Sequence, residues 1–320
     1  MWRVQIRKGG QSHSATFPNK VQAQEWATNT EAEIYAGRLG KVPSGKTFGD
    51  LIDRYIKDVT PTKRGERSER LRLERIKRDE IASVKLEDLS PDHIAGWRDR
   101  RLRQVSGASV LREITTISHA CTVAMKEWRW LRENPVKDVR KPPEAPPRQR
   151  VFTQDEIARI LQVCGCDYSS KTGRVGAALE YALETAMRAG EICALTWGNV
   201  FDNHVHLPKT KNGLPRDVPL SARAREITNL LRNAVANEKE CLVFDISPAV
   251  LDALFRKVKA KALVEGCTFH DSRRTALTRL AKVFPNVLDL ARVSGHRDLK
   301  ILSSVYYSPS IEDLSQQICR

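Results

Sequence analysis

A proline-rich string at residues 141–150 divides this chain into parts that cannot share one helix or strand. Four prolines fall within positions 142–147. Proline lacks a backbone N–H and forces the residue before it away from helical geometry, so the string predicts an extended, semi-rigid linker. Directly behind the linker, Thr153-Gln154-Asp155-Glu156 has the pattern of a capping box. This pattern predicts the first helix of a new domain.

A second boundary lies near Pro43-Ser44-Gly45-Lys46, so residues 1–45 are predicted to form a part of their own. Within it, two runs that alternate between apolar and polar side chains flank a Gly9-Gly10 turn, and the second run ends at Phe17. Alternation of this kind is typical of half-buried strands. A helix is expected over about 19–36. The first part is therefore predicted to be a β-β-α module.

Residues 46–140 are predicted to be helical throughout, because their apolar side chains recur at helical spacing. The expected core positions are Leu51, Tyr55, Ile56, Ile94, Trp97, Leu102, Leu111, Ile114, Ile117, Ala120, Trp128, Trp130 and Leu131. The basic stretch from Arg64 to Arg78 has two interpretations. It is either a solvated helix face or a track for phosphate groups.

The last part, residues 151–320, is predicted to mix helices with one β-hairpin. The hairpin is expected between 204–208 and 216–220, because Asn212-Gly213 favours a tight turn. Helices are expected at about 154–164, 174–187, from Gly190, and at 221–236, 248–264, 271–283, 286–294 and 298–305. An amphipathic tail helix is expected at 310–318. The predicted fold class is thus mostly α with small β elements.

Two imidazoles, several guanidinium groups and a phenol gather near the end of the chain. They lie in Thr268-Phe269-His270-Asp271-Ser272-Arg273-Arg274, in Ser294-Gly295-His296 and in Tyr306-Tyr307, and Arg188 stands far upstream. A phosphodiester under attack gains negative charge on its non-bridging oxygens, which fixed groups such as Arg188 and Arg273 stabilise. A phenol has a reference pKa of about 10 and needs a base or concentrated positive charge to lose its proton. The pattern predicts cleavage of a phosphodiester by a tyrosine, with no metal or other cofactor.

The order Arg, His-x-x-Arg, Gly-His, Tyr resembles the tyrosine recombinase (phage integrase) family. The resemblance implies a mixed α/β catalytic domain at 151–320, a helical core-binding domain at 46–140 and an arm-type DNA-binding module at 1–45, with 141–150 as the linker. The arm module of the family usually has three strands, and this chain is expected to begin at the second. A dimerisation hairpin is the alternative interpretation of the first part.

The resemblance also assigns roles to individual residues. The expected catalytic residues are Arg188, Lys211, His270, Arg273, His296 and Tyr306. Glu191 is expected to hold Arg188 through a charge-assisted bond, and His270 to help activate the phenol. His296 is expected to bind the scissile phosphate or the attacking oxygen.

Two of these roles have alternatives. Lys211, directly before Asn212-Gly213, is expected to protonate the leaving 5′ oxygen, and Lys209 is the competing choice. The usual family spacing from the Gly-His histidine places the nucleophile where this chain has Val305. Tyr306 is therefore expected to be the nucleophile, with Tyr307 as the alternative.

Charge and composition agree with a DNA enzyme. The net charge of +15 and the pI of about 9.7 predict an acidic polymer as partner, here double-stranded DNA. Residues 51–150 carry 24 Lys and Arg against 16 Asp and Glu, so this segment is expected to bind the phosphate backbone. No apolar run approaches the ~20 residues of a membrane span and no signal peptide is recognisable, so a cytoplasmic protein is expected.

The seven cysteines are expected to be reduced thiols. Cys164-Gly165-Cys166 and His204-Val205-His206 resemble pairs of metal ligands, but neither has a second cluster at zinc spacing. No metal site is therefore expected.

The sequence as a whole predicts a site-specific recombinase of a phage or mobile element, acting as a homo-tetramer on DNA. The tail at 310–318 resembles the tail that related recombinases dock on a neighbouring subunit. Directionality factors or host DNA-bending proteins would be further partners. Within the class, a DNA invertase or a type IB topoisomerase-like enzyme is the alternative. Outside it, a non-catalytic DNA-binding protein of the same fold is the alternative.

Overall fold

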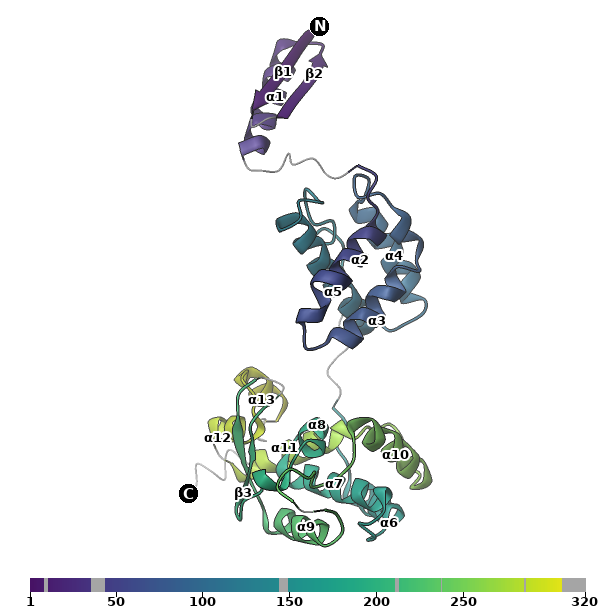
Figure 1. Ribbon diagram of the computed structural model, residues 1–320, viewed down its shortest axis with the longest axis vertical. Helices are drawn as coiled ribbons and strands as arrows, with labels where there is room; N and C mark the ends of the chain where they lie inside the picture. Colours follow the sequence, from purple (N-terminus) through teal and green to yellow (C-terminus); the bar gives the residue numbers. More distant parts are fainter. Residues whose placement is uncertain are drawn as a thin grey trace, which may run out of the picture. The chain divides into compact units, whose positions relative to one another are not determined.

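The computed structural model describes residues 1–8, 11–35, 44–143, 149–210, 213–236, 238–284 and 286–306 (Figure 1). The chain forms two compact units, Met1–Pro147 and Arg148–Arg320. The boundary between the units falls inside the proline-rich string. A further division of the first unit near residue 45 stays a prediction.

The N-terminal residues form the predicted β-β-α arrangement. Strand β1 (Trp2–Lys8) pairs antiparallel with β2 (Gln11–Phe17), and helix α1 (Lys20–Tyr35) follows. In the register of this pair, Arg3 lies opposite Thr16. The expected Gly9-Gly10 turn lies outside the described residues.

Helix α1 covers one face of this two-stranded sheet. Ile6 and Ala23 are buried between sheet and helix, and the ring of Phe17 lies 5.7 Å from that of Trp26. Because successive strand residues point to opposite faces, the other face carries the alternate positions. Those positions are polar and exposed: Arg3, Gln5, Arg7, Ser14 and Thr16.

Helices dominate the described range 44–143, as predicted. They are α2 (Phe48–Asp58), α3 (Glu66–Ile76), α4 (Pro91–Leu102) and α5 (Gly107–Lys126), with 3₁₀ turns η1 (Thr60–Thr62) and η2 (Glu80–Ser83). α2 begins at a capping box in which the backbone N of Thr47 donates to Asp50 Oδ2 at 2.8 Å.

Most of the predicted core positions of this domain are buried. Tyr55, Ile94, Trp97 and Ile114 are at most 1% exposed. The prediction was wrong for Leu102, which is 39% exposed because it is the last residue of α4, where the helix ends. The half-buried rings of the Trp128–Trp130 pair stack with Arg54, whose guanidinium carbon lies 4.4 and 4.8 Å from their centroids.

The basic stretch from Arg64 to Arg78 is largely helix α3. Part of its charge is paired with acidic residues of the same domain: Arg70 with Glu66 at 2.9 Å, Arg75 with Glu113 at 3.2 Å and Lys77 with Asp53 at 2.5 Å. Arg67 and Arg78 of the same stretch are exposed. These two side chains are therefore the better candidates for contacts to phosphate.

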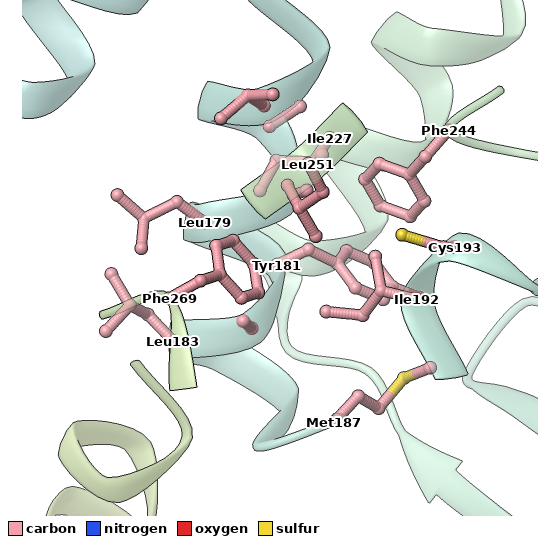
Figure 2. Packing of buried hydrophobic residues seen from close by; sticks show 14 of the residues in the cluster. Leu179, Tyr181, Leu183, Met187, Ile192, Cys193, Ile227, Phe244, Leu251 and Phe269 are labelled. Atoms are coloured by element: carbon pink, nitrogen blue, oxygen red, sulfur yellow. The ribbon is translucent and has the colours of Figure 1, made fainter. Parts of the chain in front are cut away.

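The second unit is built around helix α7 (Lys171–Thr185). The other elements are α6 (Gln154–Cys164), α8 (Ala189–Cys193), η3 (Trp197–Asn199), β3 (His204–Leu207), β4 (Arg216–Pro219), α9 (Ala222–Arg232), α10 (Pro248–Lys261), α11 (His270–Val283), α12 (Val287–Ser294) and α13 (Leu299–Val305). α7 packs against α6, α8, α9, α10 and α11. Figure 2 shows its residues Leu179, Tyr181 and Leu183 among Phe244, Leu251 and Phe269, all buried.

The helices predicted between 154 and 305 are present, with their ends shifted where helix caps determine them, and the expected tail helix at 310–318 lies outside the described residues. α7 begins before the predicted residue 174, because the Ser170 hydroxyl accepts from Gly173 N at 3.0 Å. It ends at Thr185, before the predicted 187, because Ala186 adopts a left-handed φ of 53°. The predicted fold class, mostly α with small β elements, is confirmed.

The C-terminal helices form a small apolar cluster of their own. Ala276 and Leu277 of α11, Leu290 of α12 and Leu302 of α13 are buried together. Tyr306 packs against this cluster. The cluster therefore places the residue that follows α13 beside α11 and α12.

The predicted hairpin is present. β3 and β4 pair antiparallel and end at Leu207 opposite Arg216, so residues 208–215 join them. Thr210 Oγ1 donates to Leu214 O at 2.8 Å and Gly213 has a φ of 85°. The predicted turn at Asn212-Gly213 includes a residue outside the described ranges, so it stays a prediction. Lys211 and Asn212 lie outside the described residues.

Candidate active site

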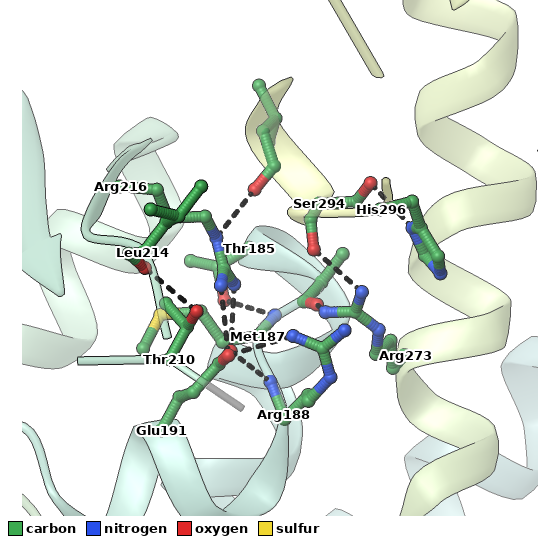
Figure 3. Close-up of polar contacts among 12 residues, drawn as sticks. Thr185, Met187, Arg188, Glu191, Thr210, Leu214, Arg216, Arg273, Ser294 and His296 are labelled. Atoms are coloured by element: carbon green, nitrogen blue, oxygen red, sulfur yellow. Dashed lines mark hydrogen bonds and ion pairs between the residues drawn. The ribbon is translucent and has the colours of Figure 1, made fainter. Parts of the chain in front are cut away.

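Arg188 stands at the start of helix α8, where the chain turns sharply out of α7. Its backbone N–H donates to Glu191 Oε2 at 2.9 Å and its Nη1 to Glu191 Oε1 at 2.9 Å, so Glu191 caps the helix and holds the guanidinium (Figure 3). The expected pairing of these two residues is present. Because α8 is short and begins at Ala189, three residues after the left-handed Ala186, the arginine between them is tied to a fixed turn of the backbone.

A second arginine, which the sequence analysis did not single out, shares the same carboxylate. Arg216, the first residue of β4, donates from Nη1 to Glu191 Oε1 at 2.9 Å and from Nη2 to Oε2 at 2.7 Å. Both side chains are buried, with 8% and 7% of their surfaces exposed. The alternating pattern at 216–220 predicted a strand but gave no partner for this charge.

The carboxylate of Glu191 stays ionised between the two arginines. Burial alone raises the pKa of Glu191, but hydrogen bonds from Arg216 and Arg188 outweigh burial and bring the pKa to about 2. One negative charge therefore faces two positive charges, and the site keeps a positive balance at neutral pH.

Arg273 lies one helical turn into α11 and is 4% exposed. Its Nη1 donates to Ala186 O at 2.5 Å, and its Nη2 donates to Ser294 O at 2.7 Å, a bond visible in Figure 3. Burial and the charge of Arg188 lower the pKa of Arg273 to about 9, so the guanidinium remains protonated at neutral pH. The structure thus brings Arg273 and Arg188 together from distant parts of the sequence.

His296 follows the C-terminus of α12, which ends at Ser294 and is capped by Gly295 with a φ of 69°. Its Nδ1 lies 2.8 Å from the hydroxyl of Ser294. The same hydroxyl lies 3.4 Å from Ala291 O, so it bridges the imidazole and the last turn of α12. Burial and the charges of Arg273 and Arg188 lower the pKa of His296 to about 4, so the imidazole is neutral at neutral pH.

Tyr306 follows α13 and lies beside His296. The centroids of the two rings are 6.5 Å apart, with the planes tilted by 48°. The guanidinium of Arg274 lies 5.4 Å from the centre of the Tyr306 ring. The structure therefore brings Tyr306 to the same site as Arg273 and His296. Tyr307 lies outside the described residues.

The remaining predicted site residues are placed less fully. His270 is exposed at the first turn of α11, three positions before Arg273 and so on a neighbouring part of the same helix face. Lys209 lines a cavity of about 500 Å³ together with Arg188, Glu191 and His206. The competing lysine therefore borders the site, whereas the favoured Lys211 lies outside the described residues.

Metal-ligand patterns do not converge in the described ranges. No group of three or more His, Cys, Asp or Glu side chains there could hold a metal ion. His206 pairs instead with Asp217 at 2.7 Å, across β3 and β4. Six of the cysteines lie in the described residues and are unpaired thiols: Cys121, Cys164, Cys166, Cys193, Cys241 and Cys267. Among the described helices, none has the length and apolarity needed to traverse a bilayer.

Comparison with known proteins gives this arrangement a family. The model of the phage integrase family matches residues 150–312. A putative integrase/recombinase of Haemophilus influenzae is 42% identical over 98% of this chain and 86% of its own length. The shufflon-specific DNA recombinase of Escherichia coli is 35% identical over 78% of this chain and 66% of its own length.

Solved structures agree on the fold. A lambda integrase tetramer bound to a Holliday junction superposes with a TM-score of 0.67 at 19% identity, covering 94% of this chain and 91% of that one. The Tn1549 transposon integrase in complex with transposon right end DNA gives a TM-score of 0.68 at 18% identity, covering 86% of this chain and 99% of that one.

This fold carries a buried Arg273, a half-buried Arg188, a neutral histidine and a tyrosine, which together define a tyrosine-type site-specific recombinase. The chain belongs to the phage integrase family. Its activity is the breakage and rejoining of DNA strands.

Proposed function

We propose that this recombinase cleaves DNA through Tyr306 and forms a 3′-phosphotyrosine, with Arg188, Arg273, His296, His270 and Lys211 as the assisting groups. The observation that carries the proposal is the meeting of Arg273, His296 and Tyr306 from three different helical segments. Such a meeting has no structural necessity in a protein that only binds DNA. It does provide the charge and the nucleophile that strand cleavage needs.

The arginines would bind the non-bridging oxygens of the scissile phosphate. A guanidinium has five N–H groups, more than Arg273 uses on Ala186 O and Ser294 O. Since both bonds go to backbone carbonyls, the guanidinium is fixed before DNA arrives. A charge held in place in a buried site stabilises the phosphorane without the cost of reorganisation.

The chemical steps conserve the number of phosphodiester bonds. The phenol oxygen of Tyr306 attacks phosphorus, the bond from phosphorus to the 5′ oxygen breaks, and Lys211 gives a proton to that oxygen. The phenol proton passes to a neutral imidazole, for which His270 and His296 are the candidates. In the second step the 5′ hydroxyl of the partner duplex attacks the phosphotyrosine and releases Tyr306. No ATP is required.

The helical domain at 46–140 and the module at 1–45 would bind the DNA outside the cleavage site. The excess of positive charge in residues 51–150 supports this role for the helical domain. The outer face of the β1–β2 sheet supports it for the module. That face carries Arg7, and it carries Arg3 and Gln5 opposite the hydroxyl side chains of Thr16 and Ser14. These residue types hydrogen-bond to base edges in the major groove.

Four copies would assemble on two DNA sites, with the 310–318 tail of each docked on its neighbour. The lambda integrase tetramer on a Holliday junction supports this number for a protein of the same fold. Integration of a mobile element is the first candidate role. DNA inversion is the second. A role other than integration is supported by a relative at 35% identity, which is named a shufflon-specific DNA recombinase.

Covalent trapping tests the proposal. The DNA that flanks the gene would be searched for repeats, and a nicked suicide substrate would be made from the repeat. Incubation with the full chain, in the presence of EDTA, should give a covalent adduct that peptide mapping places at Tyr306. Binding without any adduct, with or without magnesium, would favour the non-catalytic DNA-binding protein. An adduct that needs magnesium would contradict the metal-free mechanism. Substrates with direct and with inverted repeats would separate integration from inversion.

A further inference from the structure

Each nitrogen of the Arg216 guanidinium is bound to another part of the chain. Nη1 and Nη2 donate to the two oxygens of Glu191, and Nε donates to Val293 O at 3.1 Å. Arg216 stands on β4, Glu191 on α8 and Val293 on α12. One side chain therefore joins three elements that each border the site.

The turn that carries His296 is shaped around this arginine. Gly295 has a φ of 69°, and a Cβ atom there would lie 3.0 Å from Arg216 Nη1 and 3.1 Å from its Cδ. Residues on either side of this glycine make the site contacts: Ser294 O accepts from Arg273, and His296 faces Tyr306. The close approach means that a displaced Arg216 would displace this turn.

Arg216 is also a competitor of Arg188 for Glu191. Arg188 gives Nη1 to Oε1, whereas Arg216 occupies both carboxylate oxygens in a bidentate pair. The backbone N–H of Arg188 also donates to Oε2, but with Arg216 removed each oxygen of Glu191 would have a lone pair open to the Arg188 guanidinium. A bidentate pair between Arg188 and Glu191 would then withdraw guanidinium N–H groups that the scissile phosphate needs.

We propose that Arg216 is a positioning residue for strand cleavage, which keeps Arg188 available to the phosphate and holds the Ser294–His296 turn in place. This inference rests on the proposed function. Arg216 does not itself contact the DNA, because its nitrogens face protein acceptors and its side chain is 8% exposed.

The test compares Arg216→Met with Arg223→Met in the full chain. Arg223 is also paired with a carboxylate, since its Nη2 donates to the two oxygens of Glu180 at 2.8 and 3.1 Å, but it lies on α9 and is 42% exposed. Single-turnover cleavage of the suicide substrate and binding of the same DNA are measured for both. We expect Arg216→Met to cleave about a hundredfold more slowly, with binding within about twofold of the unaltered chain. Arg223→Met should cleave normally.

Altered phosphates separate positioning from simple damage to the fold. A methylphosphonate at the scissile position replaces one charged oxygen by a methyl group, so it needs less charge from Arg188. On this substrate the cleavage rate of Arg216→Met should approach that of the unaltered chain, and so should the cleavage rate of Arg188→Ala. A 5′-bridging phosphorothiolate, which leaves without a proton, should rescue Lys211→Ala but not Arg216→Met. Arg216→Lys keeps the positive charge but not the planar guanidinium. On the native phosphate it should cleave at a rate between those of Arg216→Met and the unaltered chain.

Three outcomes would overturn the inference. The first is normal cleavage of the native phosphate by Arg216→Met. The second is an equal loss of cleavage rate by Arg216→Met on the methylphosphonate and on the native phosphate. The third is rescue of Arg216→Met by the phosphorothiolate. If the unaltered chain itself formed no adduct on any substrate, the proposed function would fail instead.

Discussion

The guanidinium of Arg273 donates to the carbonyl oxygen of Ala186 at 2.5 Å, although 87 residues separate them in sequence. Ala186 has a left-handed φ of 53° and is fully buried. Its carbonyl belongs to the turn that ends α7 and leads into Arg188. A hydrogen bond from Arg273 to the turn that carries Arg188 therefore sets the distance between the two arginines. A shift of either α7 or α11 would alter the spacing of charge around the phosphate.

This relationship predicts different losses for the two arginines. Arg188→Ala and Arg273→Ala should each slow cleavage by at least about a hundredfold, the usual effect of removing a group that donates hydrogen bonds to the transition state. Arg273→Ala should in addition lower the free energy of unfolding by about 1–3 kcal/mol, because it leaves Ala186 O and Ser294 O without their donor. Single-turnover cleavage and urea unfolding measure the two effects. Near-normal cleavage by either variant would contradict the role assigned to the arginines.

Tyr306→Phe should retain DNA binding and abolish cleavage. The ring keeps its place against the cluster of α11, α12 and α13, so only the nucleophilic oxygen is lost. Binding is measured by titration and cleavage by adduct formation on the suicide substrate. Tyr307→Phe is the matched control and should still form the adduct. Adduct formation by Tyr306→Phe would move the assignment to Tyr307.

The sequence predicted those parts of the fold and of the site whose signals lie within a few neighbouring residues. Helix α6 runs over the predicted residues 154–164, because both its ends are encoded locally: a Thr153–Glu156 capping box starts it and Gly165, with a φ of 70°, ends it. The Arg188–Glu191 pair was also predicted, since both residues lie within one turn. Such signals need no knowledge of the rest of the fold.

The parts that could not be predicted depend on contacts between distant segments. Nothing near Arg216 in the sequence indicates that its partners are Glu191 and Val293. The same holds for Glu113, which is 2% exposed and forms ion pairs with Arg101 and Arg75 from two other helices. A charged residue in a helical pattern is normally taken for a solvent-facing position, and only the packed domain shows that this one is buried.

Acid should weaken the fold through His296. Its pKa is about 4 in the folded chain and about 6.5 when unfolded, so the unfolded chain binds the proton more readily. The stability that this neutral histidine contributes is complete above pH 6.5 and is lost as pH falls toward 4. Urea unfolding at pH 7 and pH 4.5 should show a smaller difference for His296→Gln than for the unaltered chain. An equal difference would show that His296 titrates normally in the fold.

Glu113→Ala should destabilise the helical domain by about 3 kcal/mol, because it leaves the largely buried guanidinium of Arg101 without its carboxylate. Arg101 Nε and Nη2 donate to Glu113 at 2.8 and 3.0 Å. The control is Glu66→Ala, which breaks an exposed pair with Arg70 and should cost less than about 1 kcal/mol. Urea unfolding followed by tryptophan fluorescence measures both. Similar losses for the two variants would contradict a special role for the buried pair.

Raised salt should weaken DNA binding steeply, and the exposed arginines of the basic stretch should carry part of that dependence. Each phosphate contact releases counterions, so neutralising one contact lowers the slope of log binding constant against log salt by about one. Arg67→Gln and Arg78→Gln remove exposed charges and should each do so. The control is the double variant Arg70→Gln with Glu66→Gln, which removes an ion pair and keeps the net charge. A flat salt response, or equal slopes for all the variants, would reject this stretch as a phosphate contact.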